Sequence, residues 1–373
     1  MSSAGIVLDL DSEILLWNVI TRKYDFLNVL LFAVLMLLVL IPWIEFDKWI
    51  KNIKIVINDR YIGLLKKVYL VLTLLSIFCI VYCLPYAIIA NAMGGEAVRT
   101  SETVTLLPIS PLTTLATGIA TLAPIGLLLF FVGLLDVRLK KYAIGALLIP
   151  IASVIHSMTL AARELYIFLP VTFIILYTGF RNSLTNKQDK IIKNLMWIGG
   201  GFLIFYFSII TINRFGDIGS ESFVSGTWGY IYQQPYVFDQ TLQFFDNYKG
   251  FSKSLSFIGR LLGFSTTRPD IMYVMEFSFG TMYCCFYQMF GYSSLIVGSI
   301  IYVYFFLSIA KSCIRRKNSF STLICFSIFI WFTISGLFYF RYGSIDAQFI
   351  LYILMILFSP LYPRFLKIEY VKY

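Results

Sequence analysis

Apolar residues in this chain come in long unbroken runs, without the alternation of half-buried strands. The runs are roughly 17 to 24 residues long, and a helix of about 20 apolar residues crosses about 30 Å of hydrocarbon. Strands of a membrane barrel would be shorter and would alternate. The pattern therefore predicts spanning helices and excludes a soluble enzyme and a porin.

The runs define nine predicted spans, near residues 26–44, 68–90, 112–135, 142–158, 165–180, 194–212, 291–310, 320–340 and 345–362. The predicted fold class is an all-α polytopic membrane protein with about nine transmembrane helices, within a range of eight to eleven. We expect residues 1–373 to form a single integral membrane domain.

Lysine and arginine are concentrated in five segments between or after the spans, namely 45–67, 136–141, 181–193, 311–319 and the tail after 362. These segments hold 20 of the 30 basic residues. Positively charged flanks are retained on the cytoplasmic side of a membrane. The five segments are therefore predicted to be cytoplasmic, which places the N-terminus outside and the C-terminus inside.

Composition supports a membrane protein, because 59% of the residues are hydrophobic, only 13% are charged, and the mean hydropathy is +0.80. The net charge of +10 lies in short clusters between apolar runs, so it does not indicate nucleic acid. The six cysteines show neither a disulfide framework nor metal-ligand spacing. With a single histidine and no paired-aspartate motif, we expect chemistry without a metal or other cofactor.

The longest connection, residues 212–290, lies between the sixth and seventh predicted spans and is predicted to be external. It is rich in aromatic residues, which include Tyr232 and Tyr236. These rings are either an interfacial aromatic belt or a surface on which sugars stack, and the two interpretations are compatible.

A short external hairpin carries Arg163 and Glu164 at the membrane edge. The Arg163 guanidinium could reach lipid headgroups, bind an anion inside the helix bundle, or form an ion pair with Glu164. His156, the only histidine, lies one or two turns earlier. A hydrogen-bonded structural histidine at a helix end is the commoner explanation for it, and a role in substrate binding is the alternative.

Further arginines are predicted on the external face, and they are Arg341 in a second short hairpin, Arg214 after the sixth span, and Arg260 and Arg268 in the long loop. Arginine binds phosphate groups by bidentate hydrogen bonds, which lysine cannot do. Several such arginines on one face could hold a diphosphate.

Three segments resemble the Wzy family of O-antigen or oligosaccharide repeat-unit polymerases. They are Ala162-Arg163-Glu164, the stretch Gly229-Tyr-Ile-Tyr-Gln-Gln-Pro-Tyr-Val-Phe-Asp239, and Gly280-Thr-Met-Tyr283 continuing to Phe290-Gly291. The resemblance runs loosely from about Asp136 to the C-terminus, and topology carries more of it than residue identity.

The resemblance implies a GT-C-like glycosyltransferase of the bacterial inner membrane, with a periplasmic N-terminus and large loop. Such an enzyme transfers a glycan from undecaprenyl diphosphate onto an incoming lipid-linked repeat unit. Arg163 and Arg341 would stabilise the leaving diphosphate, and Asp239, Glu164 or Asp217 would activate the acceptor hydroxyl. The implied partners are undecaprenyl-diphosphate-linked oligosaccharides, membrane lipids and a chain-length regulator protein.

Two alternatives from the same biology remain open at this point. An O-antigen ligase would use the same donor with a different acceptor. A flippase or transporter of lipid-linked oligosaccharide would move its cargo without chemistry. The transporter is the weaker alternative, because the predicted spans are nearly free of charge and no internal repeat is evident.

Overall fold

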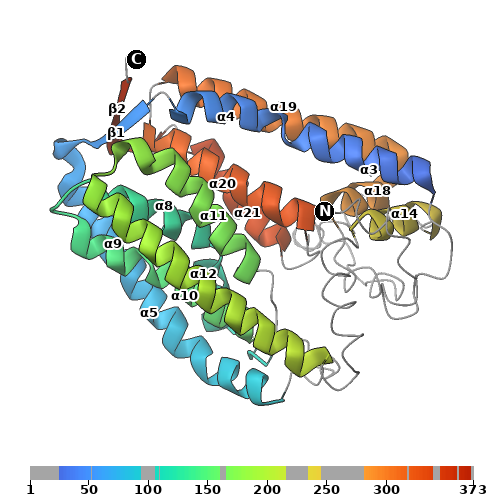
Figure 1. Ribbon diagram of the computed structural model, residues 1–373, viewed down its shortest axis with the longest axis horizontal. Coiled ribbons are helices and arrows are strands. Elements are labelled where there is room, and N and C mark those ends of the chain that lie inside the picture. Colours follow the sequence, from blue (N-terminus) through green and yellow to red (C-terminus); the bar gives the residue numbers. More distant parts are fainter. Residues whose placement is uncertain are drawn as a thin grey trace. The chain divides into compact units, whose positions relative to one another are not determined.

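The computed structural model describes residues 25–51, 53–93, 106–108, 110–159, 165–215, 234–244, 281–316, 319–338, 345–358 and 361–370. Most of these residues are helical (Figure 1). Within this part of the chain, six helices are long and apolar enough to cross a membrane, and a bent pair of helices makes a seventh. The prediction of a helical multi-pass membrane protein is confirmed at this level.

The described helices, in chain order, are α3 (Phe26–Val39), α4 (Ile41–Lys51), α5 (Ile62–Met93), α7 (Pro111–Ala120), α8 (Ala123–Leu134), α9 (Lys140–Ala146), α10 (Leu148–Met158), α11 (Leu165–Phe180), α12 (Asn186–Phe215), α14 (Gln234–Phe244), α18 (Met282–Phe290), α19 (Tyr292–Arg316), α20 (Ser319–Phe338) and α21 (Ile345–Phe358). Short 3-10 turns, η1 (Asp59–Tyr61) and η2 (Arg181–Ser183), precede α5 and follow α11.

Each of the nine predicted spans falls on one or two of these helices, but only seven meet the length and hydropathy requirement. The other two are α12 and α21. The side chains of α12 are described only as far as Gly201. The 14 residues of α21 make a helix of about 21 Å, shorter than the hydrocarbon core. The count of nine therefore stays a prediction.

The packing divides the chain into two compact units, each built from segments distant in sequence. The first draws its described residues from Met1–Ile44, Ser208–Ser308 and Phe332–Ile353, and the second from Glu45–Phe207, Ile309–Trp331 and Leu354–Tyr373. In the first unit α14 packs on α3 and on α18. In the second, α5, α7, α8, α9 and α10 pack together. The prediction of one integral membrane domain remains untested.

The span predicted near 112–135 is broken into α7 and α8, which meet at an angle of 50°. Ser110 caps α7 by accepting a hydrogen bond from the Thr113 N–H at 3.2 Å. Pro124, near the start of α8, has no N–H to donate to the carbonyl of Ala120 four residues earlier. Ser153 of α10 donates its hydroxyl to that carbonyl instead. A proline and a compensating serine thus explain the break.

A small sheet, which the hydropathy pattern did not predict, joins two distant parts of the second unit. Strands β1 (Ile53–Ile57) and β2 (Leu366–Tyr370) pair antiparallel, with Ile55 opposite Ile368. In β1 the isoleucines at 53, 55 and 57 alternate with Lys54 and Val56, and Ile55 and Ile57 are buried. This alternation over five residues is the signature of a half-buried strand.

Candidate functional site

Most of the predicted site residues lie outside the described residues: Arg163, Glu164, Asp217, Tyr232, Arg260, Arg268 and Arg341. Arg214 and Tyr236 are placed on α12 and α14 by their backbones only. Asp239 and His156 are the predicted site residues whose side chains the structure describes. The site can therefore be built upward from these two residues and from the basic segments.

Asp239 lies on α14 and is buried, with only 2% of its surface exposed. Its Oδ1 accepts hydrogen bonds from the Asn28 side-chain amide at 2.7 Å and from the Asp25 backbone N–H at 3.3 Å. The Gln243 amide nitrogen lies 2.9 Å from Oδ1 and 2.8 Å from Oδ2. All these donors are uncharged, and no lysine or arginine side chain that the structure describes forms an ion pair with Asp239.

An aromatic cluster lies beside this carboxylate in the first unit. The fully buried ring of Phe238 packs 5.4 Å from Phe32 of α3 and 6.4 Å from Tyr283 of α18, between ring centroids. Phe32 and Tyr283 are themselves in edge contact at 6.2 Å. The Tyr283 hydroxyl donates to the backbone carbonyl of Leu35. The residue after this packed aromatic position is Asp239, so its carboxylate is held at a fixed place near the start of α3.

His156 lies on α10 in the second unit, where its Nε2 is 3.0 Å from the Thr117 hydroxyl of α7. That hydroxyl also lies 2.9 Å from the Thr113 carbonyl. When the Thr117 hydroxyl donates its single proton to that carbonyl, its oxygen accepts a hydrogen bond from Nε2–H of His156. The Thr113 hydroxyl continues the network to Tyr82 of α5 at 2.7 Å and to Ser110 at 3.1 Å. These contacts give His156 the role of joining α10 to α7, and substrate binding stays a prediction.

Four of the five basic segments contact one another in the second unit. Three contacts join them: the Ile55 N–H to Ser183 Oγ at 2.8 Å, the Asn58 amide to the Arg364 carbonyl at 3.0 Å, and the Arg138 guanidinium to Asp59. Phe320, the residue after the fifth segment, packs its ring 4.8 Å from the Phe365 ring of the tail, between centroids. A common face for these segments was the premise of the predicted orientation. The side of the membrane that this face meets is not tested by these contacts.

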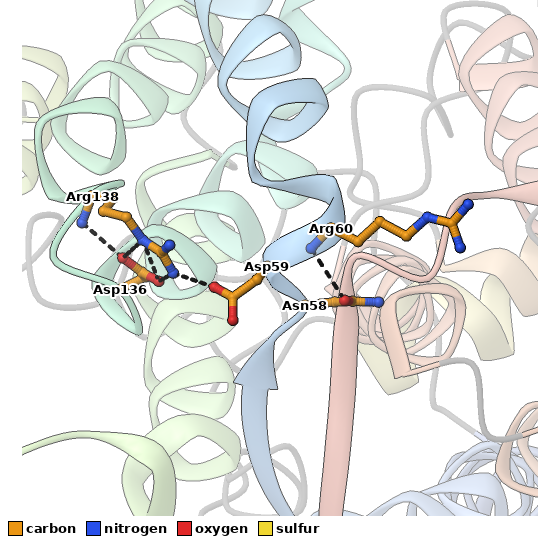
Figure 2. Close-up of polar contacts among 5 residues, drawn as sticks. All are labelled: Asn58, Asp59, Arg60, Asp136 and Arg138. Atoms are coloured by element: carbon orange, nitrogen blue, oxygen red, sulfur yellow. Dashed lines mark hydrogen bonds and ion pairs between the residues drawn. The ribbon is translucent and has the colours of Figure 1, made fainter.

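Arg138 is the centre of the polar contacts among these segments (Figure 2). Its Nε lies 3.0 Å from Asp136 Oδ1, one Nη2 hydrogen bond to Asp136 is 2.6 Å long, and the same nitrogen reaches Asp59. The Arg138 guanidinium holds the pKa of the Asp136 carboxyl below its ordinary value. Because Asp59 begins the turn before α5 and Asp136 follows α8, this bridge ties two connections together.

A second ion pair in these segments lies on the first turns of α12. Lys193 Nζ is 2.7 Å from Asp189 Oδ2, one helical turn away. Hydrogen bonds from Lys193 and from the Tyr177 hydroxyl lower the pKa of Asp189. The carboxylates of Asp59, Asp136 and Asp189 therefore each have a basic partner.

Two polar contacts were not predicted from the sequence. Asn28 was counted as part of an apolar span, although a lone amide in the first turn of a spanning helix signals a polar partner. Arg138 was counted only as one of the basic residues of its segment. Its guanidinium also binds two carboxylates, one two residues earlier at Asp136 and one distant in the chain. Nothing in the sequence indicated that the distant partner would be Asp59.

The described residues hold no group of three or more His, Cys, Asp or Glu side chains arranged to bind a metal ion. The five cysteines whose side chains the structure describes are all buried, and none of these is in a disulfide. No protein-family model matches the chain, and no match was found among curated proteins or among solved structures. The resemblance to Wzy polymerases therefore stays a prediction made from the sequence.

Proposed function

We propose that the protein is a membrane-embedded polysaccharide polymerase that joins undecaprenyl-diphosphate-linked oligosaccharides without a metal ion. One structural observation carries the proposal. Basic segments contact one another in the second unit, α11 ends beside them, and Arg163 precedes the start of α11. Ser183, after the other end of α11, contacts β1 among the basic segments. The 16 residues of α11 separate its two ends by about 24 Å.

The retention of basic residues on the cytoplasmic side does not explain an arginine that lies away from the basic face. Arg163 stands two residues before α11, Arg214 near the last turn of α12, and Arg341 between α20 and α21. An anionic substrate at the external face supplies that explanation, because guanidinium groups stabilise the charge on a leaving diphosphate as the anomeric C–O bond breaks. Arg260 and Arg268 are further candidates for the same task.

The acceptor hydroxyl requires a hydrogen-bond acceptor or base, and the three candidates are Asp239, Glu164 and Asp217. Asp239 is buried with its carboxylate already engaged, so its geometry does not support direct contact with a sugar. Tyr232 and Tyr236 would supply stacking surfaces for the glycan at the external face. We place the reaction in the bacterial inner membrane, with the N-terminus periplasmic and the C-terminus cytoplasmic.

The test begins with a deletion strain complemented by the wild-type gene, by Arg163→Lys and by Arg163→Ala. Arg163→Lys keeps the charge but loses the bidentate fork, so the activity should fall by on the order of a hundredfold while the protein level is unchanged. Arg22→Lys, a conservative change near the N-terminus, is the matched control and should be silent. The measurement is glycan ladder length beside membrane protein level.

The pattern of the deletion strain separates the alternatives. Single repeat units on the lipid anchor indicate loss of a polymerase, whereas unattached polymer indicates loss of a ligase. Full-length ladders with both Arg163 variants would remove this residue from the mechanism.

A transporter of lipid-linked oligosaccharide is the second candidate, and one specific observation favours it. The span formed by α7 and α8 is broken at Thr121–Leu122, about 15 Å along the helix from Pro111 and so near mid-membrane depth. Discontinuous helices of this kind hold substrate sites in many transporters. Transport of a labelled lipid-linked repeat unit by protein in vesicles, without polymer formation, would favour this candidate.

A further inference from the structure

The carboxylate of Asp239 has little remaining capacity to accept another hydrogen bond. Oδ1 receives bonds from Asn28 and Asp25, which match its two lone pairs. The Gln243 amide nitrogen is shared between Oδ1 and Oδ2. A general base must have an oxygen within reach of its substrate hydroxyl. A carboxylate on a residue that is only 2% exposed, and that is already bonded to protein amides, does not meet that requirement.

The same contacts stabilise the N-terminus of α3. The first N–H groups of a helix have no partner within the helix. Asp25 caps α3 by accepting from the Leu27 N–H at 2.9 Å, and Asp239 accepts from the N–H of Asp25 itself. The positive end of the helix dipole favours both carboxylates. This explains how a buried carboxylate is tolerated with only uncharged hydrogen-bond donors around it.

Asp239 also connects regions that are far apart in the chain. It lies 211 residues from Asn28 and 214 from Asp25. Among residues 216–280 of the long external segment, α14 is the part that the structure describes. The Phe238 ring packs on α3 and α18 from the neighbouring position, so α14 is fixed by an apolar contact and by a polar one.

We propose that Asp239 is a positioning residue that fixes α14 to the start of α3 through Asn28. Asn28 is its essential partner, and the catalytic base lies elsewhere. The inference rests on the proposed function only for its activity readout, because the contact itself can be tested by stability.

Exchanging the two residues tests the proposal directly. Asn28→Asp places a carboxylate at the third position of α3, where an acid is ordinarily favoured by the helix N-terminus. Any loss of stability must therefore come from neighbouring carboxylates, and Asp239 is the one that accepts a hydrogen bond from the side chain at position 28. The double variant Asn28→Asp with Asp239→Asn restores one carboxylate facing one amide, with donor and acceptor reversed. Asn186→Asp, at the exposed first residue of α12, is the matched control for an added carboxylate.

Thermal unfolding of the detergent-purified full chain is the first readout. Asp239→Asn retains one acceptor oxygen and should lower the melting temperature by only a few degrees. Asn28→Asp should lower it by roughly 5 °C or more. The double variant should regain at least half of that loss, and Asn186→Asp should be unchanged. An Asn28→Asp variant as stable as the wild type, or no recovery in the double variant, would overturn the proposal.

The glycan ladder in a complemented deletion strain is the second readout. A positioning role predicts long ladders for Asp239→Asn, short ladders for Asn28→Asp and recovery in the double variant. A base at position 239 predicts no polymer in either variant that lacks the carboxylate, at normal protein stability. If the wild-type chain makes no polymer, the proposed function fails, whereas the melting temperatures still decide whether Asn28 and Asp239 form this contact.

Discussion

The close approach of α8 to α10 makes a sharp prediction about two glycines in one broken span. A Cβ added at Gly126 would lie 2.6 Å from Ile149 Cβ and 2.9 Å from Pro150 Cδ, whereas a Cβ added at Gly118 would meet nothing within 4 Å. Gly126→Ala must therefore push α8 and α10 apart, and Gly118→Ala need not move any atom. The neighbours at Gly126 are a β-branched carbon and a proline ring, so neither can turn aside.

The expected magnitudes have opposite signs. Replacing glycine by alanine within a helix gains up to about 1 kcal/mol, which should appear in full at Gly118. At Gly126 the contact falls about 0.8 Å short of ordinary van der Waals distance. Overpacking of a rigid core costs about 1–3 kcal/mol. We expect the two variants to differ by at least about 2 kcal/mol, or roughly 3 °C in melting temperature.

The assay is thermal unfolding of each purified variant in the same detergent, followed by the fraction that remains monodisperse after heating. The melting temperature of the wild-type protein should lie below that of Gly118→Ala and above that of Gly126→Ala. Equal melting temperatures for the two variants would refute the close packing of α8 against α10. A less stable Gly118→Ala would refute the open surroundings of α7.

Three further predictions concern the basic segments, the orientation and the metal requirement. The pKa of Asp136 is lowered in the folded protein, so its pairing with Arg138 stabilises the fold fully above about pH 4, and this stabilisation is lost as the pH falls below that value. Asp136→Asn should therefore flatten the dependence of melting temperature on pH between about 5 and 3. An unchanged dependence would contradict this. A cysteine at Ser252 should react with an impermeant reagent in spheroplasts while one at Asn318 is protected, and the reverse pattern would invert the orientation. Polymerisation by purified protein should continue in excess EDTA, and a loss that magnesium or manganese restores would contradict metal-independent chemistry.

The sequence by itself located the apolar helices and the segments that carry the positive charge. Both features are local, because a run of apolar residues must satisfy its own backbone hydrogen bonds in lipid. The caps of α3 at Asp25 and of α7 at Ser110 also depend on residues within a few positions. Such features depend on neighbours in the chain, so a pattern can predict them.

Only the tertiary structure shows which segments pair or pack with one another. Nothing in the pattern of residues 53–57 indicated that they would pair with residues 366–370, because the alternation of a short strand does not identify its neighbour. The burial of α8 on all sides was equally hidden, since lipid and protein interior favour the same apolar residues.

For the candidate site the division is the same. Residue type marked Asp239 and His156 as notable, but their meaning depends on groups that folding brings near. Asn28 approaches Asp239 across 211 residues, and Thr117 approaches His156 across 39. A carboxylate enclosed by amides and a histidine bonded to a threonine hydroxyl then have different chemistry from the same residues in water, because burial and hydrogen bonding set what each group can accept or donate.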